Sequence, residues 1–522
     1  MNRLCVGLWP MLLALILPAT AATGTVALSS GGIFLRALPD LGLVALATNS
    51  AAGYTVAVGN CGARDCAMTL DTHTGAMLRS VALPAGAFGG MGDGCPGPPT
   101  RLVLDASRQQ AIITTYDSFA CGDVVGYVSI VDPRRGRVRR VITPWTLWRP
   151  LARSGPHVPP PSAPGGVAVA EHLGRLFILN GPQNGPTLNG GSITLVDLTT
   201  AAVRDVPLPP REVGPSIIAV DEGAGRLYFV TYPVDVFRAI NGPAHLHVLD
   251  TRNGRDLGIT TLPAVYSWPV LASPTGPLIL LGRGARLPSL GYVRGLDTAG
   301  RTQGAATSVG AWPRTVLDDP LTGHAFVLST GYSDGLEKDG VIKVPGSVTM
   351  LDLPSLAVRR TITVDALLMG GVLDAQRNHL FVVTAHTPGP TGKTGGPDRV
   401  VMLDTLSGAV LRTLPLPSNP VALALDHRHA RLFVVSRGPL GSEHVDGWPP
   451  LGYGSVSVID TRTGALQQTI RVGVDPFLLT LDEQASRLFV ATRGGSLPQP
   501  PVPGSPQRII PGTLTLLNTA AP

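Results

Sequence analysis

Two groups of side chains have the chemical types that bind metal ions. His245 and His247 alternate along an apolar run, so they lie on one side of an expected strand and could contribute to a metal site. Asp334, Glu337 and Asp339 could bind calcium from within one loop. We favour ordinary packing for the two histidines and solvation for the loop carboxylates, and we predict no metal site.

Other motifs that could support catalysis are incomplete. The segment 391–395 (TGKTG) resembles a phosphate-binding loop, but position 387 is Thr387 where the first glycine belongs. It also precedes an expected strand, whereas the anion in such loops sits at a helix N-terminus. The turns at 71–75 and 460–464 lack the acid spacing and closing Glu of a calcium loop, so we interpret them as hairpin turns. No H-E-x-x-H or C-x-x-C-H motif occurs, and we predict neither a catalytic residue nor a cofactor.

The elements that would position a site come from an internal repeat. The frame of 419–472 returns in 475–517, 214–262 and 165–208, each time with strand-like runs that we name a to d in chain order. Runs a and b, such as 421–425 and 432–435, are almost wholly apolar, which indicates strands buried on both faces. Run d alternates polar and apolar residues, which indicates a half-exposed outer strand. A four-stranded sheet of this kind is typical of a β-propeller blade.

The number of units follows from the residue that ends each run c. Nine such residues occur, roughly 47 to 65 positions apart. They are Asp71, Asp132, Asp197, Asp250, Asp297, Asp352, Asp404, Asp460 and Asn518. Because propellers usually have roughly four to eight blades, seven or eight blades remain alternatives to nine.

The ends of the repeat predict how the ring closes. The ninth unit lacks run d, and spare strand-like sequence at 24–38 precedes the first unit. We expect this N-terminal strand to complete the last blade, which leaves no open repeat end. The predicted fold is therefore an all-β, single-domain β-propeller of four-stranded antiparallel blades over residues 23–522.

The two faces of such a ring differ in their connections. The a–b and c–d turns share one face and are uniformly tight, whereas the b–c and d–a connections share the other and vary in length, with b–c loops expected at 331–345 and 494–511 among others. We call the second one the long-loop face. Long loops on a rigid scaffold are where binding usually resides, so we expect a binding surface there. The alternative is that these loops only cover a wide ring.

Two sets of candidate binding residues lie on this face. Several d–a connections end in a proline just before run a, so the neighbouring residues are expected at the rim of the central channel. These ligand-binding candidates are Trp268, Trp312, Arg314, Asn419 and Asp475. They fit a small-ligand or peptide pocket, with packing of the Trp rings between blades as the alternative. The longest d–a connection, 143–164, supplies a partner-binding set that could grip an anionic partner or only anchor the loop: Trp145, Trp148, Arg149, Arg153 and His157.

The N-terminus and the cysteines indicate export. Residues 1–22 have the basic start, short apolar run and Ala-Thr-Ala site of a signal peptide, with an uncleaved anchor as the alternative. The remaining cysteines, Cys61, Cys66, Cys95 and Cys121, are even in number, which predicts two disulfides in an oxidising compartment. Proximity favours Cys61–Cys66 and Cys95–Cys121 among three pairings. We expect a periplasmic or secreted protein without a membrane span after cleavage.

The charge gives little information about partners. The formal charge is +6, and only 15% of the residues are charged. One basic cluster could form a nucleic-acid patch, but we interpret it as a solvated outer strand and turn, and we expect no nucleic-acid partner. It comprises Arg134, Arg135, Arg137, Arg139 and Arg140.

One segment resembles a known family. The run 458–495 (VIDTRTGALQQTIRVGVDPFLLTLDEQASRLFVATRGG) resembles the YVTN-type repeat of YncE-like β-propeller proteins in its "VID" strand, "T-x-T-G" turn, "TI-x-VG-x-x-P" and "RLFVA". Related stretches recur over most of 42–518. The resemblance implies an exported propeller, usually of seven blades, from which the nine units depart. Similar propellers occur in lactone-hydrolysing enzymes and in the large subunit of quinone-dependent amine dehydrogenases. Only structural positions match, so no catalytic residue is carried over.

The sequence as a whole predicts a non-enzymatic binding propeller outside the cytoplasm. It would engage an unknown protein, glycan or small ligand through its long-loop face. The alternatives are a propeller enzyme, either a lactonase-type hydrolase or a quinone-linked dehydrogenase subunit, and a purely structural envelope component. An enzyme would need convergent carboxylates or a metal at the channel mouth, where Asp475 is the only acid that we can place.

Overall fold

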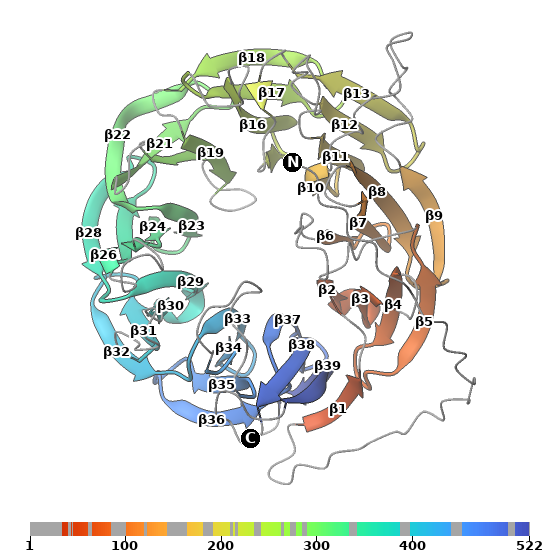
Figure 1. The fold of residues 1–522 in the computed structure, drawn as a ribbon. Coiled ribbons are helices and arrows are strands. Elements are labelled where there is room, and N and C mark those ends of the chain that lie inside the picture. Colours follow the sequence, from red (N-terminus) through yellow and green to blue (C-terminus); the bar gives the residue numbers. More distant parts are fainter. Residues whose placement is uncertain are drawn as a thin grey trace, which may run out of the picture.

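Nine four-stranded antiparallel sheets form a ring around a central axis (Figure 1). The computed structural model describes residues 34–39, 43, 45–60, 65–84, 101–119, 123–142, 164–180, 192–208, 212–213, 218–233, 242–262, 266–271, 278–283, 290–333, 342–386, 397–439, 452–498 and 507–520. The predicted β-propeller is confirmed, with nine blades rather than the seven or eight that remained alternatives. All nine predicted unit ends, including the one at Asp297, lie at or next to the end of the third strand of a blade.

Each blade is one consecutive stretch of chain, and only the last also takes a strand from elsewhere. Blades 1 to 3 are β2 (Ala45–Asn49), β3 (Tyr54–Asn60), β4 (Asp65–Asp71), β5 (Met77–Ala82); β6 (Arg101–Asp105), β7 (Gln110–Phe119), β8 (Asp123–Asp132), β9 (Arg137–Ile142); and β10 (Pro164–Ala170), β11 (Arg175–Asn180), β12 (Ser192–Asp197), β13 (Val203–Pro207). Blades 4 to 6 are β15 (Ile218–Asp221), β16 (Arg226–Pro233), β17 (His245–Asp250), β18 (Asp256–Thr261); β19 (Tyr266–Leu271), β20 (Leu278–Arg283), β21 (Leu290–Leu296), β22 (Thr302–Ala311); and β23 (Pro313–Asp319), β24 (His324–Ser329), β27 (Ser347–Asp352), β28 (Ala357–Thr363). Blades 7 to 9 are β29 (Leu367–Asp374), β30 (His379–Ala385), β31 (Arg399–Asp404), β32 (Val410–Pro415); β33 (Pro420–Asp426), β34 (Arg431–Ser436), β35 (Ser455–Asp460), β36 (Leu466–Arg471); and β37 (Pro476–Asp482), β38 (Arg487–Pro498), β39 (Gln507–Asn518).

The N-terminal strand closes the ring. Strand β1 (Phe34–Pro39) pairs antiparallel with β39, with Leu38 opposite Leu514, and so becomes the fourth strand of blade 9. On the axial side, Thr480 of β37 donates a hydrogen bond to Thr48 of β2 at 3.2 Å, which joins blade 9 to blade 1. The predicted closure is confirmed.

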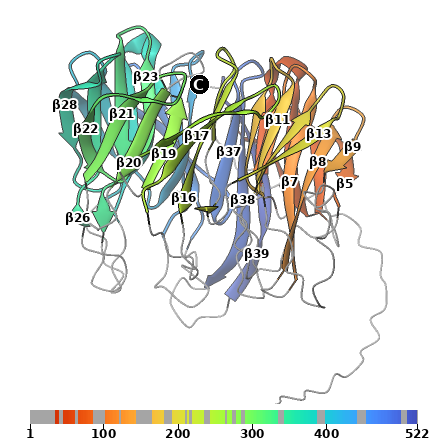
Figure 2. The ribbon, with the colours of Figure 1, turned by 90° about the horizontal axis from the view of Figure 1, so that it is seen from above.

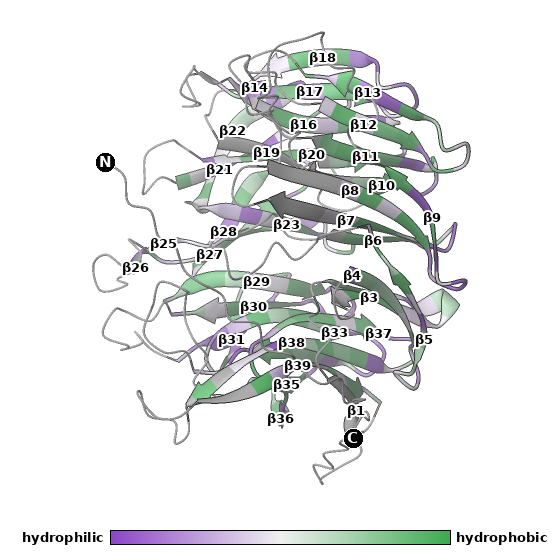
Figure 3. Cartoon of the chain, turned by 45° about the vertical axis from the view of Figure 1, so that its right-hand side comes forward, coloured by the Kyte–Doolittle hydropathy of each residue, from purple (hydrophilic) through white to green (hydrophobic). Residues whose placement is uncertain are grey.

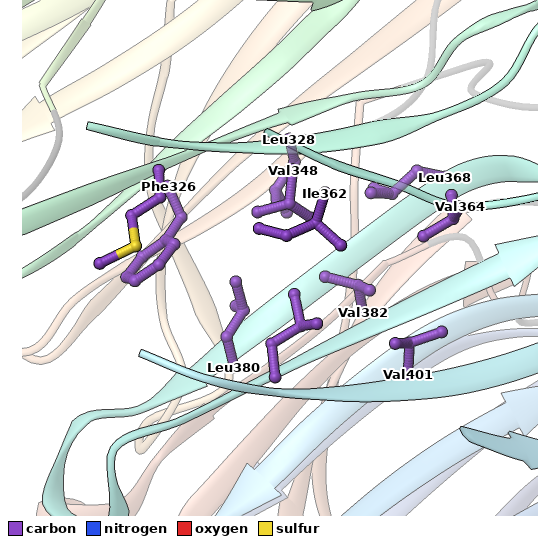
Figure 4. Close-up of a cluster of buried hydrophobic side chains, with 11 residues drawn as sticks. Phe326, Leu328, Val348, Ile362, Val364, Leu368, Leu380, Val382 and Val401 are labelled. Carbon is purple, nitrogen blue, oxygen red and sulfur yellow. The ribbon is translucent and has the colours of Figure 1, made fainter. Parts of the chain in front are cut away.

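The blades are held together by apolar seams, because the second and third strands of each blade are buried on both faces, as β34 and β35 are. The prediction that run a is buried on both faces is wrong, since the innermost strands are only partly buried, as β33 and β37 are. Figure 4 shows one seam, where Phe326 and Val348 of blade 6 pack against Leu380 and Val401 of blade 7. Blade 4 has the buried Tyr228 at the third residue of its second strand, and blades 3, 6, 7, 8 and 9 each place a buried Phe there: Phe177, Phe326, Phe381, Phe433 and Phe489. Burying one such ring contributes about 2–3 kcal/mol relative to exposure. Figure 3 shows these hydrophobic strands, with hydrophilic residues gathered at strand ends and turns.

The tight turns are built from Asp and Gly, as predicted. In the turn after β35, the Asp460 side chain accepts the N–H of Thr463 at 3.0 Å, and Gly464 adopts a φ of 66° that a side chain would strain. A second set of Asp residues ends the first strand of several blades and is fully buried. Asp426, for example, accepts the His429 N–H at 3.0 Å and contacts its Nδ1 at 2.8 Å.

Two connections contain more strand than expected. We predicted 494–511 as a loop, but β38 and β39 are each 12 residues long and stay paired from Gly494–Pro511 to Pro498–Gln507. This ribbon extends beyond the blade (Figure 2). The connection 331–345 contains a second small hairpin of β25 (Tyr332–Ser333) and β26 (Ile342–Val344). No helix among the described residues is long and apolar enough to cross a membrane.

Candidate functional site

Three of the predicted rim residues occupy the same structural position in three blades. Trp312, Asn419 and Asp475 each precede the proline that starts an innermost strand, and each has a positive φ, of 56°, 61° and 52°. Each carbonyl accepts the N–H of the residue that comes directly after the proline's pairing partner on the second strand, at 3.0, 2.8 and 3.0 Å. Such φ values are uncommon outside glycine, so the recurring hydrogen bond holds the backbone in one shape while the side chain differs.

The residue after each of these prolines forms a β-bulge. Arg314, Val421 and Phe477 are the extra residues where β23, β33 and β37 lose register with their partner strands. Arg314 is exposed, and Val421 keeps 41% of its surface accessible although it is apolar. Bulges re-aim side chains at sheet edges, and here they turn one side chain per blade out of the innermost strand.

The other predicted residues are placed differently or lie outside the described residues. Trp268 is inside β19 opposite Leu281, and strand β19 already begins at Tyr266. It therefore does not share the position of Trp312. Pro269 is tolerated there because an innermost strand has a free edge, where a missing N–H costs no ladder bond. Trp145, Trp148, Arg149, Arg153 and His157 lie outside the described residues, as do Cys61, Cys95 and Cys121. Cys66 is disulfide-bonded, and which cysteine it pairs with stays a prediction.

Guanidinium groups stacked on aromatic rings gather on the long-loop face. Arg283 lies 3.9 Å above the Trp312 ring, Arg471 lies 3.5 Å above Tyr453, and Arg493 lies 4.2 Å above Phe477. Arg283 and Arg471 end strands that run to this face, and Arg493 lies within β38, which continues beyond the blade on this side. Sequence reasoning missed these contacts, although Arg-Gly pairs after run b at 283–284, 437–438 and 493–494 were a visible signal.

Arginines near the opposite face are paired with turn carboxylates instead. Arg139 contacts Asp132 at 2.7 Å, and Arg175 contacts Asp197 at 2.8 Å. Three further pairs of this kind are Arg359–Asp352, Arg377–Asp374 and Arg301–Asp297. The basic cluster at 134–140 belongs to this group, since it lies on β9 and the turn before it, as we expected. Several arginines of the tight-turn face are thus paired with carboxylates, and others, such as Arg360 and Arg412, donate to backbone carbonyls.

A buried carboxylate lies next to Asn419. The Asp398 side chain accepts the N–H groups of His386 at 2.8 Å and of Asn419 at 2.6 Å. Burial raises the pKa of Asp398, although these hydrogen bonds and the nearby His386 oppose the rise. The carboxylate ties the start of β33 to the entry of β31, so its role at the rim is to hold the backbone.

A cluster of titratable side chains lies in blade 4, around the two histidines that the sequence analysis considered as metal ligands. The sequence did not single out the carboxylate that joins them. Glu212, in the short strand β14 (Glu212–Val213), lies between the two histidines of β17. One carboxylate oxygen is 2.8 Å from Nδ1 of His245, and the other is 3.2 Å from Nε2 of His247 and accepts a hydrogen bond from Thr231. His247 is 2% exposed and stacks on Phe229 at 4.8 Å.

Hydrogen bonding controls the ionisation of this cluster. Burial raises the pKa of Glu212, but the hydrogen bonds from His247, Thr231 and His245 outweigh it and lower the pKa to about 2. The imidazoles contact different carboxylate oxygens and do not converge on one point. No group of three or more His, Cys, Asp or Glu side chains in the described part of the chain is placed to hold a metal ion. The cluster is a tether that fastens the d–a connection of blade 4 over its second and third strands.

Comparisons with known proteins leave the family open. No protein-family model and no curated protein matches the sequence. Among solved structures, the dihydro-heme d1 dehydrogenase NirN in complex with DHE aligns over 80% of this chain and 73% of its own, with 12% identity and a TM-score of 0.49. Sqt1 of Saccharomyces cerevisiae aligns over 85% of this chain and 100% of its own, with 10% identity and a TM-score of 0.46. The quinohemoprotein alcohol dehydrogenase from Comamonas testosteroni aligns over 93% of this chain and 76% of its own, with 10% identity and a TM-score of 0.46. Likeness this distant carries no functional argument, and the propeller assignment rests on the strand topology described above.

Proposed function

We propose that this chain is a binding propeller that engages a ligand through the long-loop face, around the central axis. The observation that carries the proposal is the recurring backbone of the rim. Trp312, Asn419 and Asp475 share one conformation and one hydrogen bond but differ in chemistry. A scaffold that repeats its backbone and varies its side chains is suited to recognition, because the rigid frame fixes the place of each contact.

The distribution of charge supports the same face. Several arginines near the tight turns are paired with neighbouring Asp residues, as in Arg175–Asp197 at 2.8 Å. On the long-loop face, Arg471 lies on an aromatic ring, and stacking leaves the edge of a guanidinium available to hydrogen-bond a ligand. Membership of the YVTN-type propellers and a location outside the cytoplasm belong to the proposal, supported by the repeat at 458–495 and the signal-like residues 1–22.

The test is a binding screen against glycan and peptide arrays, followed by variants on each face. Arg314→Glu and Val421→Glu change exposed rim side chains on the innermost strands. Arg462→Glu is the control, because Arg462 is 64% exposed on a tight turn and lies 3.9 Å from Asp460. We expect the rim variants to weaken binding of the array ligand and the control to leave it unchanged. Loss of binding in Arg462→Glu alone would place recognition on the wrong face and refute the proposal.

A further inference from the structure

We infer that the seam between blades 8 and 9 is a binding site for an anionic group of the phosphate, sulfate or carboxylate class, formed by Arg437, Arg471 and Arg493. The inference rests on the proposed function, because the site lies on the same face, and it specifies the chemistry recognised there.

Two of the arginines share one carboxylate. Nε of Arg437 is 2.5 Å from one oxygen of Asp475, and Arg493 reaches the other oxygen at 3.4 Å. Asp475 is 8% exposed, and its backbone is fixed by the Arg493 N–H bound to its carbonyl at 3.0 Å. The carboxylate thus orients both guanidinium groups, while the Arg437 side chain stays 28% exposed and the Arg493 side chain 44% exposed.

The third arginine adjoins this pair through closely packed backbone. Arg471 lies 3.5 Å above the Tyr453 ring. A Cβ on Gly454 would lie 2.3 Å from Pro476, and one on Gly438 would lie 2.6 Å from the Tyr453 carbonyl. The backbone of Tyr453 and Gly454 therefore packs between the residues that follow Arg437 and Asp475, which places Arg471 at the same seam as the other two arginines.

The site has more hydrogen-bond donors than acceptors. Each guanidinium carries five N–H donors and no acceptor. Among the described side chains, the Asp475 carboxylate is the one hydrogen-bond acceptor that these three arginines contact, and Arg471 and Arg493 also stack on the rings of Tyr453 and Phe477. Three positive charges face one negative charge. An oxyanion matches this surplus, because guanidinium edges bind carboxylate, phosphate and sulfate oxygens through charge-assisted hydrogen bonds.

The repeat shows that the cations are concentrated at this seam. The positions equivalent to Arg437 and Arg493 hold Thr330 in blade 6 and Ala385 in blade 7, whereas blade 5 has Arg283 there, which stacks on Trp312. The same backbone therefore carries a hydroxyl or a methyl group there. The fold itself does not require an arginine at this position, which leaves recognition as the reason for two adjacent ones.

The experiment is calorimetric titration of the full chain with inorganic pyrophosphate, sulfate and citrate in 20 mM NaCl. We expect at least one anion to bind at a stoichiometry near one, with an affinity that falls in 200 mM NaCl because salt screens exposed charges. The order of the three affinities distinguishes phosphate, sulfate and carboxylate as the recognised group.

Variants locate the binding. Arg471→Gln should raise the Kd about tenfold, the effect of losing one charge-assisted hydrogen bond, and Arg493→Gln should act similarly. Arg462→Gln removes the same charge from an exposed tight turn and should leave the Kd unchanged. Equal weakening in Arg471→Gln and Arg462→Gln, or no binding of any of the three anions, overturns the inference. If the array ligands still depend on Arg314 and Val421 in that case, the proposed function stands without this site.

Discussion

Glu212→Gln tests whether the blade 4 tether stabilises the fold through its charge. The variant keeps the size of the side chain and removes the negative charge that faces His245 and His247. The folded pKa of Glu212, about 2, lies below its ordinary value of 4.5. A depressed pKa means that the ionised form stabilises the folded state. This contribution is complete above about pH 4.5 and is lost as the pH falls towards 2.

The size of the effect follows from that shift. The difference between 4.5 and about 2, at about 1.4 kcal/mol per pH unit, corresponds to about 3 kcal/mol at neutral pH. Solvent screening reduces this little, because the Glu212 side chain is 11% exposed. We expect Glu212→Gln to be less stable than the wild type by up to about 3 kcal/mol at pH 7 and equally stable near pH 2.

Urea unfolding followed by circular dichroism across pH 2–7 measures the difference. Glu483→Gln is the control, because it removes the same charge from a half-buried turn position that forms no ion pair within the described structure. A stability difference that stays constant from pH 7 to pH 2 would mean that the amide disturbs packing and that the charge is irrelevant. Equal stability of the variant and the wild type at pH 7 would refute the tether outright.

Three further predictions concern the ring. Deleting 34–39 removes β1, and we expect faster amide hydrogen exchange in β39 and a lower thermal midpoint, whereas unchanged exchange would contradict closure by β1. Phe433→Ala should cost about 3–5 kcal/mol because the ring is 1% exposed in the seam of blades 8 and 9, and Leu466→Ala, at 45% exposure, should change stability by less than about 0.5 kcal/mol in the same denaturant titration. Gly473→Ala would bring a Cβ to 2.6 Å from the hydroxyls of Thr492 and Thr513, so we expect the free energy of unfolding to fall by about 1–3 kcal/mol. An unchanged thermal midpoint in differential scanning calorimetry would show that the two threonines move aside without cost.

The repeat could be predicted because its signals are local. The Asp at the end of run c accepts a hydrogen bond from its own turn, as Asp460 does from the N–H of Thr463. Each unit therefore carries a turn motif that is visible in the sequence. The rim positions of Trp312, Asn419 and Asp475 followed from the prolines after them. Trp268 did not fit this rule, because β19 continues through its proline. A proline alone does not distinguish the start of an innermost strand from its interior.

Features that depend on contacts between separate segments of the chain could not be predicted. Glu212 contacts His247 because the connection that leads into blade 4 contains β14, which pairs with β16. No sequence motif predicts that β14 forms there. The stacking of Arg493 on Phe477 joins two strands of one blade, and Arg471 meets Tyr453 across another. The ribbon of β38 and β39 looked like a loop because its tip region is rich in Gly and Pro, yet ladder pairing persists through Pro511.

Closure by β1 also dictates the order of events when the chain folds. Strand β1 must wait for a partner that follows roughly 470 residues later. At a synthesis rate of about 5–20 residues per second, β39 emerges roughly 25–95 s after β1. During that interval the outer flanks of the first and last completed blades stay bare, and each bare edge can recruit a strand from another molecule. Closure of the ring by β1 and β39 of one chain therefore competes with earlier strand pairing between different chains. Dilution favours closure within one chain.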